Sequence, residues 1–217
     1  MALRFGPLAL LVSYVDQTAY APDELERRRA DETWLRSEAR LHEHVASRAS
    51  SAGSFVPARL LQVFPHRLAL EDAAADHAAR WSRSLTRFAE KREFALHVFA
   101  GPHSAPPSES YLLRVASHVS KSVRRIPLKA SDEIVARVGE LWRACAAHAT
   151  AVRRVEGAAA RRGEGVSARG LLGSLVYLVA ASEAESVPLV VANASVAGAE
   201  LGLTYYLEGP RAPFSFI

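Results

Sequence analysis

The feature that most constrains the fold of this chain is the alternation of strand-like and helix-like segments in its first hundred residues. Short apolar runs with β-type composition are separated by longer segments whose apolar residues recur every three to four positions. Helices that cross between strands cover the faces of a sheet, so the pattern predicts an α/β-type sandwich. The expected strands span residues 8–15, 54–64 and 93–100, and the expected helices span 22–50 and 70–90.

A stretch rich in proline and serine, GPHSAPPSES at 101–110, interrupts this alternation. Such composition is typical of a linker, and 217 residues can form two small domains. We therefore expect an α+β chain with an N-terminal domain at 1–100 and a C-terminal domain at 111–217. The C-terminal domain is expected to combine long helices with a small sheet. Its helices are predicted at 111–125, 131–154 and 182–197, and its strands at 171–181 and 200–208.

The last residues, LTYYLEGPRAPFSFI at 203–217, are unusually apolar for a chain end. Phe214, Phe216 and Ile217 would each gain about 1.5–3 kcal/mol from full burial. Two interpretations stay open. The tail either docks on its own domains, where the phenylalanines fill a gap between them, or is presented to a partner.

Composition and charge favour a cytoplasmic protein that binds neither nucleic acid nor membrane. The chain is 49% hydrophobic and 23% charged, which is ordinary for a globular protein, and no apolar run reaches the roughly 18 residues that span a bilayer. Its single cysteine, Cys145, forms no disulfide within the chain and fits a reducing compartment. The net charge is only +4, and acidic residues are interspersed with the arginines.

The residue types give no coherent catalytic, cofactor or metal site. None of the eight histidines has the i, i+4 spacing of the metalloprotease helix motif, and the glycines of RRGEGVSARG precede a strand instead of following one. We expect no enzyme activity, no cofactor, no metal and no small-molecule substrate. Two alternatives remain: an enzyme whose site gathers His42, Arg59 and His97, or an arginine-rich protein that binds nucleic acid.

Six segments in a fixed order carry a family resemblance. They are PLALLVSYVD, then WLRSEARLHEHV with SFVPARLLQVF, then REFALHVFAG, SYLLR, LLGSLVYLVA, and the tail with its Gly-Pro and Pro-Phe-Ser-Phe. The second segment contributes His42, Pro57, Arg59 and Phe64. Taken together, the segments resemble the GvpL/GvpF family of gas vesicle proteins.

The resemblance implies a non-catalytic accessory or assembly protein at the gas vesicle. Its expected partners are the hydrophobic vesicle shell protein and other minor gas vesicle proteins. The resemblance also implies a ferredoxin-like N-terminal domain. That domain would lack an edge strand, because the family usually has a further strand before the first segment, unless the start of the chain is misassigned. The residues expected to bind a partner or dock between domains are Pro57, Arg59, Gly209, Pro210, Pro213, Phe214 and Phe216.

Overall fold

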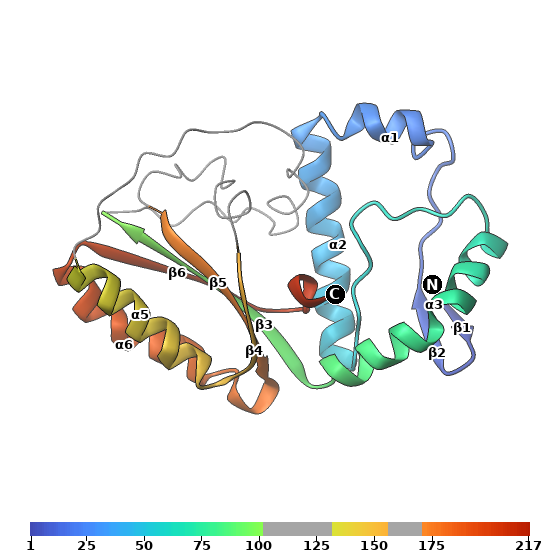
Figure 1. Cartoon of the computed structure of the whole chain (residues 1–217). Helices are drawn as coiled ribbons and strands as arrows, with labels where there is room; N and C mark the ends of the chain where they lie inside the picture. The colour runs from blue at the N-terminus through green and yellow to red at the C-terminus, as the bar shows by residue number, and fades with distance from the viewer. Residues whose placement is uncertain (102–131, 156–170) are drawn as a thin grey trace. The chain divides into compact units, whose positions relative to one another are not determined.

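The computed structural model describes residues 1–101, 132–155 and 171–217, which form two units (Figure 1). Unit 1 spans Met1–Ala89 and unit 2 spans Glu90–Ile217. The division falls before the strand at 91–100, not after it, because that strand pairs with two strands from later in the chain. Residues 102–110 of the expected linker and the expected helix at 111–125 lie outside the described residues.

Unit 1 begins with a hairpin and continues with three helices. The strands β1 (Ala2–Phe5) and β2 (Leu8–Leu11) pair antiparallel. The turn between them contains Gly6 at φ +53°, a left-handed conformation that glycine adopts without steric cost. Only the first half of the strand expected at 8–15 is formed. The helices are α1 (Pro22–Arg28), α2 (Glu32–Ala52) and α3 (Arg67–Phe88).

The single helix expected at 22–50 is divided into α1 and α2. Asp31 causes the division, since its carboxylate accepts the backbone N–H groups of Thr33 and Trp34 and thereby caps a new helix. The strand expected at 54–64 is absent, and residues 54–66 form neither helix nor strand. Pro57 lacks the N–H that a sheet ladder needs, and His42 of α2 instead bonds the carbonyl of Ala58. The helix α3 agrees with the expected 70–90.

Unit 2 contains a four-stranded antiparallel sheet in the order β4-β5-β3-β6. Its described elements are β3 (Lys91–Ala100), α5 (Asp132–Ala146), β4 (Ala149–Arg154), β5 (Leu171–Ala180), α6 (Ser186–Glu200) and β6 (Leu203–Arg211). This βαββαβ order is that of a ferredoxin-like fold. The α+β class is confirmed. The ferredoxin-like arrangement, however, belongs to unit 2 and not to the N-terminal domain, because β3 supplies its first strand.

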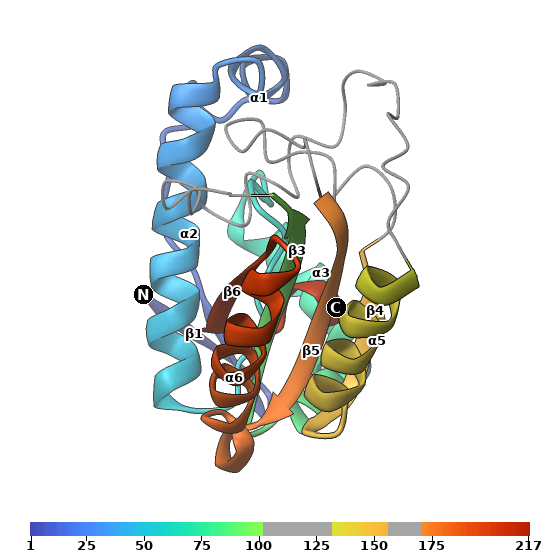
Figure 2. The same ribbon diagram turned by 90° about the vertical axis from the view of Figure 1, so that its left-hand side faces the viewer.

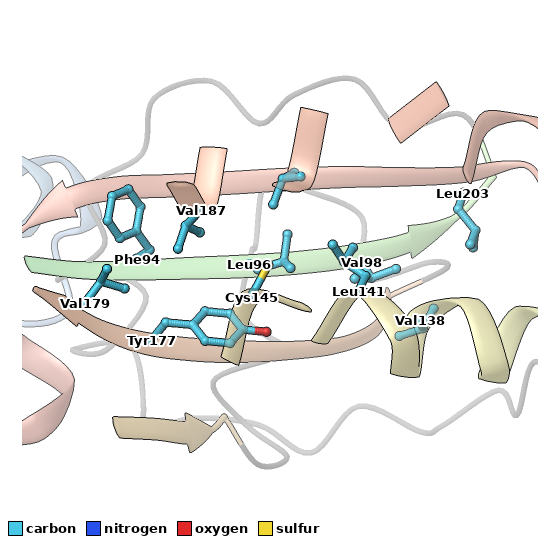
Figure 3. Close-up of a cluster of buried hydrophobic side chains, with 11 residues drawn as sticks. Phe94, Leu96, Val98, Val138, Leu141, Cys145, Tyr177, Val179, Val187 and Leu203 are labelled. Carbon is cyan, nitrogen blue, oxygen red and sulfur yellow. The ribbon is translucent and has the colours of Figure 1, made fainter. Parts of the chain in front are cut away.

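One face of this sheet packs on α5 and α6 (Figure 2). Alternate residues of β3 and β5 point toward the helices, including Phe94 and Leu96 of β3 and Tyr177 of β5 (Figure 3). The core cluster consists of Phe94, Leu96, Val98, Val138, Leu141, Cys145, Tyr177, Val179, Val187, Val191 and Leu203. Both central strands are apolar on this face, which explains why they were readily predicted.

No helix among the described residues is both long and apolar enough to cross a bilayer.

Candidate functional site

The opposite face of β3 carries a buried charge. Because side chains alternate along a strand, Glu93, Ala95 and His97 point away from α5 and α6. The side chain of Glu93 is fully buried, with 0% of its surface exposed. A buried carboxylate is tolerated only when it is paired and hydrogen bonded, so its partners indicate what this face is built to hold.

Glu93 accepts hydrogen bonds from two residues near the chain end. Arg211 lies opposite Glu93 in the β3–β6 register and donates from Nε to Oε1 at 3.0 Å. Ser215 donates its backbone N–H to Oε2 at 2.7 Å and its hydroxyl to Oε1 at 3.0 Å. Burial raises the pKa of Glu93, and the Arg211 guanidinium and the Ser215 donors oppose that rise.

The polar contacts continue across the same face. Arg211 donates from Nη1 to Glu208 at 2.7 Å, and Glu208 lies 3.8 Å from His97 Nε2. His97 Nδ1 is 2.7 Å from the hydroxyl of Ser174 on β5, and its ring stacks on Tyr206. Three neighbouring strands therefore share one polar network, which includes the last residue of β6.

The tail docks on this face of unit 2. Pro213 is fully buried, and Phe214–Phe216 form the short 3₁₀ helix η2. The carbonyl of Ser215 accepts a hydrogen bond from Arg153 of β4. Since β5 lies between β3 and β4, the contacts of Ser215 with Glu93 and Arg153 bridge β5. On β5, Val176 pairs with Arg153 of β4, and Leu178 pairs with Glu93 of β3. Both of these β5 side chains are fully buried.

The Gly209–Pro210 step brings the chain into this position. Gly209 has φ +119°, and a Cβ there would lie 2.6 Å from the Glu93 carbonyl oxygen and 2.9 Å from Cδ1 of Phe94. Both the conformation and the close approach to β3 thus require glycine. The peptide bond between Gly209 and Pro210 is cis.

The residues expected from the sequence to bind a partner lie in both units. In unit 1, Pro57 is buried and Arg59 is exposed, on either side of the Ala58 carbonyl that lies 3.1 Å from His42 Nε2. His97, the third residue of the alternative enzyme site, belongs to unit 2.

In unit 2, Gly209 and Pro210 are exposed, Pro213 is buried, and Phe214 and Phe216 are half-buried.

Four residues that take part in these contacts were not among the residues expected from the sequence, namely Glu93, Arg153, Ser174 and Glu208. The alternation of EFALHVFA did place Glu93 and His97 on one face, but it gave no indication that this face is covered. Arg211 and Ser215 lie inside the tail motif, and the local pattern contains no information about their partner on β3. Their role follows only from the strand register.

The polar network holds the backbone and the hydroxyl of Ser215, and its one series of catalytic residue types is inaccessible to a substrate. Ser174, His97 and Glu208 form a hydroxyl, imidazole and carboxylate series, but the serine is only 2% exposed. A substrate carbonyl would not reach its oxygen in this conformation. Among the residues that the structure describes, no group of three or more His, Cys, Asp or Glu side chains is placed to hold a metal ion.

Comparison with known proteins gives matches over almost the whole chain. The model of the family described as gas vesicle synthesis protein GvpL/GvpF matches residues 1–217. Gas vesicle protein L of Streptomyces sp. (strain CB03234) is 28% identical over 225 residues, which cover 99% of this chain and 81% of that protein.

Two crystal structures of gas vesicle protein GvpF share the fold. The protein from Anabaena sp. PCC7120 has a TM-score of 0.51 at 16% identity, over 81% of this chain and 72% of its own. The protein from Microcystis aeruginosa has a TM-score of 0.53 at 11% identity, over 81% of this chain and 75% of its own.

Proposed function

Because this chain belongs to the GvpL/GvpF family of gas vesicle synthesis proteins, we propose that it is a non-catalytic accessory protein of gas vesicle assembly. In this proposal it acts in the cytoplasm and at the vesicle, where it binds the hydrophobic shell protein together with other minor vesicle proteins. The observation that carries the proposal is the family match over residues 1–217. A match of that extent covers both units.

The outer face of α6 supports an apolar partner. No charged residue occurs between Ser186 and Ala199, and the helix exposes Leu189 (63%) and Val196 (75%). A surface helix normally carries charged residues on its solvent side. Exposed apolar positions one or two turns apart on an uncharged helix are typical of an interaction surface. A shell subunit that exposes apolar surface before it polymerises would fit such a face.

The proposal is tested first by removing the protein. We expect deletion of its gene in a vesicle-forming host to reduce or abolish vesicles, as counted by electron microscopy. We also expect the purified protein to retain the shell protein in a pull-down assay. Normal vesicle numbers together with no retention of the shell protein would contradict the proposal.

The α6 surface is tested separately by substitution. We expect the double substitution Leu189→Ser with Val196→Ser to weaken retention of the shell protein by at least tenfold, because both side chains lose apolar area at the contact. Leu41→Ser on α2, which removes a leucine that is 60% exposed, is the matched control and is expected to retain binding. Equal effects of the two changes would reject α6 as the docking face while leaving the assembly role itself intact.

A further inference from the structure

All three polar groups of Ser215 form hydrogen bonds with residues of the sheet in unit 2. Its N–H and hydroxyl bind the carboxylate of Glu93 at 2.7 and 3.0 Å, and its carbonyl accepts from Arg153. Two of these groups belong to the backbone and the third is a hydroxyl. These contacts match a peptide segment that carries a small hydroxyl side chain.

Glu93 would still require donors if the tail were absent. The carboxylate is fully buried, and Ser215 supplies two of the hydrogen bonds that it accepts. A buried acceptor that loses its donors is costly, so the empty site would favour any segment able to replace them. Between Glu93 and Arg153 lies β5, whose Val176 and Leu178 provide an apolar floor for the flanking residues.

The tail can leave this site without breaking the sheet. The pairing of β6 with β3 ends at the Glu93–Arg211 pair, and residues 212–217 follow it without further strand pairing. These residues, APFSFI, contain no charged side chain. Their release would cost contacts at the site but no ladder hydrogen bond.

We propose that Glu93, Arg153 and the β5 surface between them form a peptide-binding site for a short uncharged segment with a serine between apolar residues. The segment 212–217 is its resident and exchangeable occupant. The same segment from a second copy of this chain can replace it, so the tails of two copies can exchange. This inference does not depend on the proposed role in vesicle assembly.

The test is a competition on the full chain. A synthetic peptide with the sequence of residues 212–217 is added in excess, and deuterium uptake of the protein's own tail is followed by mass spectrometry. We expect uptake at 212–217 to rise with peptide concentration and to saturate, because the peptide displaces this segment. Uptake that stays unchanged up to millimolar peptide would overturn the proposal.

Peptide variants show whether the serine is recognised. The Ser215→Ala peptide loses one hydrogen bond to a charged group. We therefore expect half-maximal displacement to need a concentration of this peptide at least about tenfold higher than that of the parent peptide. The Ser215→Thr peptide keeps the hydroxyl and should resemble the parent peptide. If all three peptides act alike, recognition of the serine hydroxyl by Glu93 is rejected.

Variants of the protein itself test the role of Arg153 without added peptide. Arg153→Ala removes the donor to the Ser215 carbonyl from an exposed position, and we expect several-fold faster deuterium uptake in the tail. Arg154→Ala is the matched control, since it is the next residue on β4 and points to the opposite face. Equal uptake in the two variants would overturn the assignment.

Discussion

At the residue scale, the carboxylate of Glu93 is strongly constrained, since it is fully buried and held by partners from the end of the chain. Acidic side chains are rarely buried without partners, and this one is held between the last strand and the tail. The sequence showed an acidic residue at the start of an apolar strand, which by itself is typical of a solvent-exposed strand end. The buried state could not be predicted, because it depends on Arg211 and Ser215, more than a hundred residues away.

Substitution of Gly209, which lies near the end of β6, tests how closely this part of the chain approaches β3. We expect Gly209→Ala to lower the free energy of unfolding by about 2–4 kcal/mol, because it adds a Cβ at a positive φ and within 2.6 Å of the Glu93 carbonyl oxygen. Urea denaturation followed by far-UV circular dichroism measures the change.

The control for that measurement is Gly202→Ala. Gly202 also has a positive φ, +66°, but a Cβ there meets nothing within 4 Å. We expect it to cost only the conformational strain, about 1–2 kcal/mol. Equal losses for the two variants would show that the close approach at Gly209 is absent in solution.

At the element scale, the strongly periodic segments were predicted and the irregular ones were not. The helix α3 and the strands β3 and β5 have uninterrupted patterns and formed close to where they were expected. The break between α1 and α2 was missed because the apolar spacing continues across Asp31, whose capping role is visible only in its hydrogen bonds. Residues 54–64 have strand-like composition, but they pair with none of the strands that the structure describes, and they follow α2 as an irregular segment.

The contact between α2 and that irregular segment should make stability depend on pH. Burial lowers the pKa of His42 below 6.5, although the Ala58 carbonyl partly opposes the shift. The folded protein therefore binds the proton less tightly than the unfolded chain. The stabilisation is fully present above pH 6.5 and is lost as the pH falls through the depressed pKa.

We expect thermal unfolding of the wild type to shift to lower temperature between pH 7.5 and 5.5, and expect His42→Gln to reduce that shift. Nuclear magnetic resonance titration of the His42 ring measures its pKa directly. A pKa at or above 6.5 would contradict the prediction.

At the scale of the whole molecule, the unexpected finding is which unit contains β3. Proline-rich composition at 101–110 predicts a boundary there, which places the strand before it in the N-terminal domain. In the structure β3 lies between β5 and β6 at the centre of the second sheet. It completes the βαββαβ order of unit 2, and therefore the ferredoxin-like arrangement is found there.

Two fragments distinguish the alternative boundaries. We expect the fragment 90–217 to fold cooperatively with the circular dichroism spectrum of an α+β protein. The fragment 101–217 lacks the central strand, so β6 loses its pairing partner and the core loses Phe94, Leu96 and Val98. We expect it to be largely unfolded or aggregated. A folded 101–217 fragment would restore the boundary that the linker composition suggested.

The sequence by itself determined the α+β class, most of the regular elements, the apolar character of the tail and the family to which the chain belongs. All of these depend on residue types over short spans or on the order of motifs. Only the tertiary structure decided which strands pair with β3 and where the tail docks. Strand pairing depends on mutual burial and backbone hydrogen bonds between segments far apart in the chain, and the apolar period of a strand is the same whichever strand it joins. For the same reason, the Glu93–Ser215 contact became visible only when both ends of unit 2 were placed together.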